Sequence, residues 1–266
     1  MWVRDEDDWS GISDPAERRK IQNRRNQRIL SMVYCTQHES SSLVSAEQYC
    51  MDFDIETIAL ALRSVRTLDR NSEHSQSGMR HFEDFANRCY AARAPAIALR
   101  PFLSQYNFIR ALWANVEVLG LASSQMADDD AISPFNSADP KRADTPTALN
   151  PALPPGLQPT DLQSSTLHHP WLDLIPIPAM RDNIFRRGLN DTEEEDLCHD
   201  MRGRVHQDPG VLVWRDPWDY HGWEVTEDFV RAWGWALVGC SELFLSTNQW
   251  RALRGEKPLF RITEEQ

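Results

Sequence analysis

The chain has 266 residues, of which 41% are hydrophobic, and its formal net charge is −12. This length allows one sizeable core with flanking segments. The negative charge argues against nucleic-acid binding by the body of the protein, because phosphates repel an acidic surface. The five cysteines lie far apart and form no CxxC pair, which fits a reducing compartment and predicts neither a disulfide framework nor a zinc finger.

Neither a signal peptide nor a membrane span is expected. The first residues, Met1–Asp8, are charged rather than apolar. The most apolar run, Phe229–Leu245, is interrupted by Arg231 and Glu242. A membrane-spanning helix needs about 20 predominantly apolar residues, so the sequence predicts no contact with a membrane.

The stretch Asp14–Ser31 is predicted to form a basic helix. Asp14 can accept hydrogen bonds from the first turn, Pro15 suits the first helical position, and Glu17 completes a capping box. Amides that pair with base edges, flanked by cations that neutralise phosphates, are what a helix in the DNA major groove needs. The residues predicted to contact DNA are therefore Arg18, Arg19, Lys20, Asn23, Arg24, Arg25, Asn26, Gln27 and Arg28.

This stretch, ERRKIQNRRNQR, resembles the front of the basic region of fungal bZIP proteins, whose motif reads Asn-x-x-Asn-Gln-Arg-Ala-Tyr-Arg. Asn23, Asn26, Gln27 and Arg28 match the motif. The next three residues, Ile29, Leu30 and Ser31, stand where the motif has Ala, Tyr and Arg. The alternative interpretation is a solvated basic helix or a localisation signal, because basic runs alone are common.

The leucine zipper that the resemblance implies is absent from the positions where it should lie. It is expected to begin at Ser40 and to continue by heptads to Glu47, Asp54 and Ala61. None of these residues is a leucine, and Ser40–Ser42 is a poor coiled-coil seam. The resemblance therefore implies a basic region that is half present and a zipper that is absent.

Two helices separated by a loop are predicted next. Asp54–Leu68 is expected to be helical, with an apolar stripe at Ile55, Ile58, Leu62 and Val65. Asn71–Gly78 is expected to be a polar loop. Met79–Tyr90 is expected to be a helix carrying Phe82, Phe85 and Cys89.

The segment Gln105–Leu121 shows the most regular helical spacing, and a proline-rich stretch follows it. Its stripe consists of Ile109, Leu112, Val116 and Leu119, and Gly120 is placed to end the helix. Ser123–Thr166 then contains seven prolines and the acidic run Asp128–Asp130. This composition predicts a mobile loop or linker rather than a packed element.

The C-terminal part is rich in tryptophan, with seven of the ten tryptophans between Trp171 and Trp250. Each ring can bury about 150–250 Å², so we expect a core here. Val211–Trp214 is predicted to be extended and to end in a turn at Asp216–Pro217. Thr226 is predicted to cap a helix. The buried face of that helix is expected to comprise Phe229, Trp233, Leu237, Cys240 and Phe244.

The same part resembles DUF3425, a poorly understood fungal domain that commonly follows such basic regions. The matching patterns are HPWLDLIPIPAMRDN from His169, WxDPWDxxGWEVT, the Trp233–Trp235 pair and STNxWRxxRGE. Gln105–Leu121 resembles a further piece of it. One departure is Ala232, where a lysine often stands.

Two groups of residues could indicate catalysis or metal binding. Asp216, Asp219, His221 and Glu224 lie close together in sequence, and such residues can bind metal or perform acid–base chemistry. The competing interpretation is that DPWDYHG is turn chemistry. The second group, Cys198, His199 and His206, matches no familiar zinc spacing. We expect no catalytic residue, no metal and no cofactor.

The sequence thus predicts a mainly α-helical protein. The expected organisation is a degenerate bZIP-like basic region with a polar linker (1–45), a helical segment (46–122), a Pro- and Ser-rich linker or loop (123–166), and a Trp-rich helical domain (167–266) that packs with 46–122. The resemblances imply a nuclear transcriptional regulator that binds DNA weakly or not at all. Expected partners are DNA, a homo- or heterodimer partner, and a protein bound by the C-terminal domain. The alternatives are an interaction module that does not bind DNA and, less favoured, an enzyme built on His221.

Overall fold

The structure is a computed structural model, and it is mainly helical, as predicted. It describes residues 57–62, 64–91, 100–136, 153–203 and 208–262. All of these belong to one compact unit, Asp52–Gln266; a second unit, Met1–Met51, lies outside the described residues.

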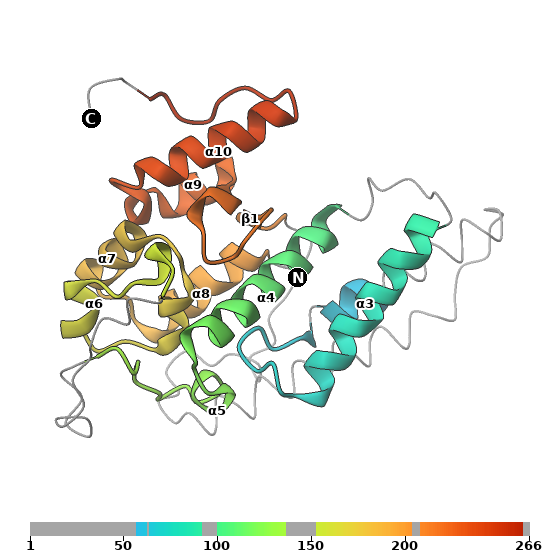
Figure 1. Ribbon diagram of the computed structural model, residues 1–266, viewed down its shortest axis with the longest axis horizontal. Coiled ribbons are helices and arrows are strands. Elements are labelled where there is room, and N and C mark those ends of the chain that lie inside the picture. Colours follow the sequence, from blue (N-terminus) through green and yellow to red (C-terminus); the bar gives the residue numbers. More distant parts are fainter. Residues whose placement is uncertain (1–56, 63, 92–99, 137–152, 204–207, 263–266) are drawn as a thin grey trace, which may run out of the picture. The chain divides into compact units, whose positions relative to one another are not determined.

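The elements follow one another along the chain with two short strands between the last helices (Figure 1). The α-helices are α3 (Glu73–Ala91), α4 (Arg100–Leu119), α5 (Ser123–Met126), α6 (Asp161–Ser165), α7 (Pro178–Arg187), α8 (Asp191–Arg202), α9 (Glu227–Trp233) and α10 (Ser241–Leu253). The 3-10 helices are η5 (Pro155–Leu157), η6 (Pro170–Leu174), η7 (Tyr220–Gly222) and η8 (Gly234–Leu237), and the strands are β1 (Val211–Val213) and β2 (Trp223–Val225).

The predicted loop at Asn71–Gly78 is wrong, because α3 begins at Glu73 and includes most of it. The Ser72 hydroxyl accepts from the backbone N–H of Ser75, as an N-cap side chain does. Most of the polar residues that suggested a loop lie exposed in the first turns of the helix, whereas Ser75 is fully buried and accepts from the Arg66 backbone N–H. The predicted helix over Met79–Tyr90 is confirmed as the continuation of α3.

The helix predicted over Asp54–Leu68 ends earlier than expected. In its described part it covers residues 57–64, apart from residue 63, and Val65 lies in a bend. The described part of its stripe is nevertheless buried, with Ile58, Leu62 and Val65 each at most 7% exposed. Ile55 lies outside the described residues. These side chains form one core with α3 and α4, comprising Ile58, Leu62, Val65, Met79, Phe82, Phe85, Cys89, Tyr106 and Ile109.

Helix α4 connects this core to a second and larger one. It contributes Ile109 to the first core and Phe108, Leu112 and Val116 to the second, so that one broad apolar face of the helix is shared between the two cores. The predicted stripe of this helix is therefore confirmed. Gly120 ends the helix with a φ of 67°, a conformation that glycine adopts without steric cost.

The stretch Ser123–Thr166 was predicted to contain no packed element, and this is wrong for its described part. Residues 137–152 lie outside the described residues. On either side of them, α5, η5 and α6 are formed, and Ser133, Leu157 and Gln163 are at most 1% exposed. Thr160 caps α6 by accepting from the Gln163 backbone N–H at 3.0 Å. Ser133 and Gln163 thus make hydrogen bonds inside the protein instead of facing water.

Strands β1 and β2 form an antiparallel hairpin in which Val211, Leu212 and Val213 pair with residues of β2. The extended segment predicted at Val211–Trp214 is confirmed. The side chain of Trp223 in β2 is fully buried and meets Phe108 of α4 edge-on, with ring centroids 6.2 Å apart. The hairpin therefore packs against α4.

The single helix predicted after Thr226 is wrong, although Thr226 does cap α9, as expected. Helix α9 ends at Trp233 and is followed by η8, and Gly239, with a φ of 75°, separates η8 from α10. The Asn183 amide donates to the carbonyls of Ala236 and Val238 at 3.0 and 2.7 Å, which satisfies acceptors that the break leaves free.

Candidate functional site

The residues predicted to contact DNA, Arg18–Arg28, lie outside the described residues. No described helix is both long and apolar enough to cross a membrane.

Side chains from two patterns of the sequence, WxDPWDxxGWEVT and STNxWRxxRGE, meet at the buried carboxylate of Glu224 on β2. Arg254, just after α10, donates to both of its oxygens, at 2.9 Å from Nη1 and 2.5 Å from Nη2. The Trp214 indole N–H donates to the same carboxylate at 2.8 Å. Glu224 is 2% exposed, so these donors replace its water. The hydrogen bonds with Glu224 raise the pKa of Arg254.

Trp250 of α10 completes this group, which we call the Glu224 cluster: Trp214, Glu224, Trp250 and Arg254. The Trp214 and Trp250 rings stack with centroids 5.5 Å apart and planes 24° apart. The Trp250 indole donates to the His221 carbonyl at 2.8 Å, and the Arg254 guanidinium lies 5.2 Å from the Trp214 ring centroid. Both charges are neutralised inside the cluster, so the cluster fastens α10 to the hairpin.

Arg254→Met is expected to lower the free energy of unfolding by about 2–3 kcal/mol, because a buried carboxylate loses its charge partner. The loss is below that of a fully buried pair, since 23% of the Arg254 side chain is exposed. The control is Arg231→Met on α9, whose side chain is 66% exposed and pairs with Glu227 and Asp228. It should change stability by about 0.5 kcal/mol or less. Equal losses in urea denaturation would contradict this account.

A second group of polar residues is buried around Asp173 in η6, itself 1% exposed. Its carboxylate accepts from the Ser133 hydroxyl at 2.6 Å and from the Gln163 amide at 2.5 Å. The His168 Nε2 lies 2.8 Å from the same carboxylate, and His168 Nδ1 lies 2.7 Å from the Thr166 carbonyl. Residues on both sides of 137–152 thus converge on one carboxylate.

This grouping of Ser, His and Asp is not a catalytic triad. A nucleophilic serine must donate to the histidine, which the aspartate then orients. Here Ser133 and His168 reach the same carboxylate side by side. Ser133 is also fully buried. We interpret the group as the hydrogen-bonded support of η6.

Next to it lies Arg181 of α7, a fully buried guanidinium. Burial lowers the pKa of Arg181 to about 10, which keeps it cationic at neutral pH. It donates to Gln163 Oε1 at 3.0 Å and to the carbonyls of Gly156, Ile175 and Gln158 at 2.5–2.7 Å. One side chain therefore holds η5, α6 and the segment after η6 together.

Two of the four residues considered for catalysis, Asp219 and Glu224, have structural roles. The Asp219 side chain accepts from the backbone N–H of His221 and caps η7, while its carboxylate lies 2.8 Å from His221 Nδ1. Glu224 is held inside the Glu224 cluster. Asp219 thus has the backbone-capping role that the interpretation of DPWDYHG as turn chemistry predicts.

No group of three metal-binding side chains is found in the part of the chain that the structure describes. In the other predicted group, His206 lies outside the described residues. Burial raises the pKa of Cys198 to about 11. Its thiol is therefore protonated at neutral pH, and the thiolate is the form that binds metal.

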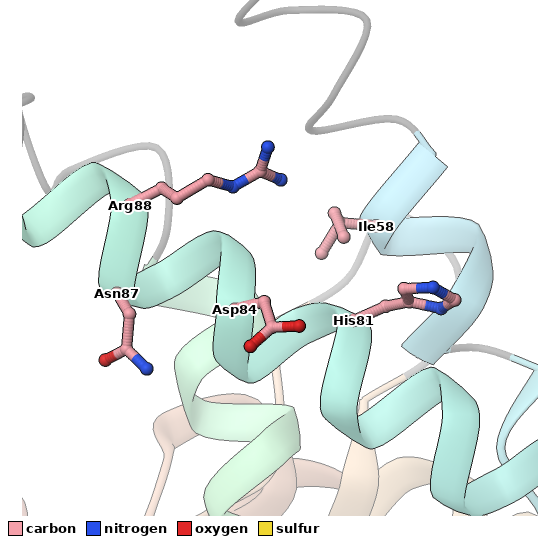
Figure 2. Close-up of a pocket in the computed structure, with 5 residues that line it drawn as sticks. All are labelled: Ile58, His81, Asp84, Asn87 and Arg88. Carbon is pink, nitrogen blue, oxygen red and sulfur yellow. The ribbon is translucent and has the colours of Figure 1, made fainter.

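A shallow hollow lies beside α3 (Figure 2). Ile58 forms part of its lining, and His81, Asp84, Asn87 and Arg88 project from the exposed face of α3. Small-molecule sites are concave and mostly apolar. A lining made largely of exposed polar side chains does not fit that description, and we assign no ligand to the hollow.

Residues 141–243 match a family described as a domain of unknown function, DUF3425. No curated protein and no solved structure matches the chain. The DUF3425 match includes the hairpin and α9 but ends at the third residue of α10. Trp250 and Arg254 therefore lie beyond the match, and the whole of α4 lies before it. The structure joins all three to the DUF3425 region.

Proposed function

We propose that this protein is a transcriptional regulator of the fungal bZIP type whose DNA binding is weakened or lost. The observation that carries the proposal is the DUF3425 match at residues 141–243, because this domain occurs in fungal bZIP-type factors. The resemblance of Arg18–Arg28 to the front of a bZIP basic region supports it independently. Such a protein acts in the nucleus.

The charge distribution restricts any DNA contact to the N-terminal stretch. Six cations lie within Arg18–Arg28 in a chain whose net charge is −12. In bZIP proteins two basic helices fork across the major groove from a zipper dimer. Without leucines in register, a second basic helix is not held beside the first. We therefore propose weak binding that depends on phosphate contacts.

A tethering experiment tests the regulatory function without relying on this chain's own DNA binding. The full chain, fused to an unrelated DNA-binding domain, should change transcription of a reporter carrying that domain's site. As a fluorescent fusion, the chain should accumulate in the nucleus, and replacing the six cations with glutamine should reduce that accumulation. A tethered chain that leaves the reporter unchanged would count against the proposal.

The alternative is an interaction module that no longer binds DNA and keeps only the role of its C-terminal domain. The abrupt loss of the motif after Arg28, where Ile29–Ser31 replace Ala-Tyr-Arg, favours it. Specific retardation of DNA by the chain would distinguish the two candidates, since only a DNA-binding regulator produces it.

A further inference from the structure

The segment that follows α10 turns back and runs beside that helix (Figure 1). Gly255, with a φ of 74°, reverses the chain, and the Glu256 backbone N–H donates to the Arg251 carbonyl at 2.9 Å. This pattern is the Schellman motif that commonly ends helices. We call residues 257–262, the last that the structure describes, the tail segment.

Three residues of α10 hold the tail segment: Phe244, Asn248 and Arg251. They are four and three residues apart, so they lie along one side of the helix. Ser246 and Thr247 bond to the hairpin from another side of the same helix. The side that holds the tail segment is therefore fixed to the fold independently of the tail segment.

Asn248 binds the backbone of the tail segment with its whole side-chain amide. Its Oδ1 accepts from the N–H groups of Leu259 and Phe260 at 2.9 and 3.1 Å, and its Nδ2 donates to the Phe260 carbonyl at 2.8 Å. The Arg251 Nε donates to the Lys257 carbonyl at 2.7 Å. Main-chain contacts of this kind give affinity for an extended peptide, while side-chain contacts give specificity.

One side chain of the tail segment makes such a specific contact. The Phe260 ring stacks on the Phe244 ring, with centroids 4.0 Å apart and planes 22° apart. Stacked aromatic pairs contribute to stability beyond the area that they bury. Leu259 is half-buried, and the other residues of the tail segment are exposed. The arrangement therefore selects an aromatic residue at one position and an apolar residue before it.

The tail segment is held weakly compared with the rest of the fold. None of its residues is buried, and no backbone–backbone hydrogen bond joins it to another described residue. Segments with few buried apolar contacts open at a low cost in free energy, without unfolding of the core. When the tail segment opens, α10 remains bonded to the hairpin. The side of α10 that it leaves is then a preformed binding site.

We propose that this side of α10, formed by Phe244, Asn248 and Arg251, is a peptide-binding site that takes an extended segment of a partner protein in exchange for the tail segment. The partner segment carries an aromatic residue at the position of Phe260 and an apolar residue at that of Leu259. It must bind more tightly than the tail segment in order to displace it. The proposal does not depend on DNA binding by the N-terminal stretch.

A partner protein is favoured over the tail segment of a second copy. The connection from α10 to the tail segment is short, so each copy presents its own tail segment to its own site at an effective concentration of about a millimolar. The tail segment of another copy has the same sequence and no advantage in affinity. It would therefore exchange only at protein concentrations of that order.

Hydrogen exchange of the full chain tests whether the tail segment opens by itself. In the closed form, Asn248 protects the backbone N–H groups of Leu259 and Phe260. These groups should exchange about tenfold or more faster than those in the middle of α10, because they open locally. Asn248→Ala should raise both rates further. Exchange as slow as that of α10 would show that the tail segment opens only when the fold does, and would overturn the proposal.

Fluorescence anisotropy tests the site itself. The probe is a labelled peptide with the sequence of residues 257–262. The full chain with Phe260→Ala should bind the probe about tenfold or more tightly than the parent chain does, because its own tail segment competes less well. Adding Asn248→Ala should weaken binding about tenfold or more, since three hydrogen bonds are lost. A peptide with alanine in place of the phenylalanine should bind weakly to every chain.

The matched control is Gln249→Ala in the Phe260→Ala chain. Gln249 follows Asn248 but is exposed and lies on another side of α10. It should leave peptide binding unchanged, and every variant should keep a cooperative thermal unfolding transition.

Three binding results would overturn the proposal: no binding of the probe by the Phe260→Ala chain, equal binding by the parent chain, and binding unaffected by Asn248→Ala. Concentration-dependent dimerisation of the parent chain that Asn248→Ala abolishes would assign the site to a second copy, which would also contradict the proposal.

Discussion

Arg181→Met is expected to lower the free energy of unfolding by about 3–5 kcal/mol, a large share of the roughly 5–15 kcal/mol typical of a domain. The substitution removes the donors for four acceptors: Gln163 Oε1 and the carbonyls of Gly156, Gln158 and Ile175. Methionine fills similar space but donates no hydrogen bond. Each buried acceptor left without a donor costs about 1–3 kcal/mol.

The control for Arg181 lies on the same helix. Arg186 of α7 has a side chain that is 61% exposed and pairs with Asp182 four residues earlier. Arg186→Met should change stability by about 0.5 kcal/mol or less, since exposed pairs of this kind contribute little. Urea denaturation of the full chain measures both variants. An Arg181→Met protein as stable as its parent would show that these hydrogen bonds are not needed.

A fragment limited to the DUF3425 match, residues 141–243, is expected not to fold on its own. It lacks α4, whose Phe108, Leu112 and Val116 belong to the larger core. It also lacks Thr247, whose hydroxyl accepts from the backbone N–H of Val225 at 3.2 Å. The Trp223 ring, fully buried in the whole chain, would lose its contact with Phe108. A ring of this kind buries about 150–250 Å². A small fragment has too little other apolar surface to compensate for losing that burial.

Residues 57–262 provide the comparison for this fragment. They include both cores and Arg202 of α8, which donates to the Leu62 and Val65 carbonyls and so joins α8 to the helix at 57–64. We expect this longer piece to unfold cooperatively, with a far-UV circular dichroism spectrum of a helical protein. Fragment 141–243 should show neither property. A cooperatively folded 141–243 fragment would contradict the shared core.

Much of the helical structure follows from local sequence. The apolar stripe of α4, its end at Gly120 and the start of α9 at Thr226 depend on neighbouring residues, so they could be predicted. The start of α3 was not predicted because the first turns of this helix are as polar as a loop, and Ser72, which caps the helix, is the one residue that marks its start. The break before α10 was missed because the apolar spacing continues across it, and only Gly239 marks the change.

The buried polar residues could not be predicted in the same way. Arg181 and Arg186 are both arginines of α7, yet one is fully buried and the other is exposed. What distinguishes them is the position of carbonyls from η5 and η6, which the tertiary fold alone determines. Ser133 and Gln163 were assigned to a linker for the same reason, since their partner Asp173 lies outside that stretch, 40 residues from Ser133 and 10 from Gln163. The Glu224 cluster likewise required α10 and the hairpin to meet.

DNA titration of the full chain tests the central claim, that this is a bZIP-type regulator with weakened DNA binding, most directly. Labelled palindromic and scrambled duplexes are titrated at two salt concentrations, with Arg24→Ala and Asn23→Ala as variants. We expect dissociation constants in the micromolar range or weaker, nearly equal for both duplexes, as for non-specific binding. If all six cations of Arg18–Arg28 contact phosphates, the slope of log affinity against log salt should be about −5.

The physical reason for weak binding is that ordering costs exceed the base contacts that remain. A helix of about 15 residues is only marginally stable alone, and each good bidentate contact from Asn23 or Gln27 contributes about 1–3 kcal/mol. Without a zipper, the second half-site loses an avidity factor of about 10²–10⁴. Arg24→Ala should therefore weaken binding to both duplexes equally, and Asn23→Ala should change little. Nanomolar binding that selects the palindrome at physiological salt, and that Asn23→Ala abolishes, would contradict the account.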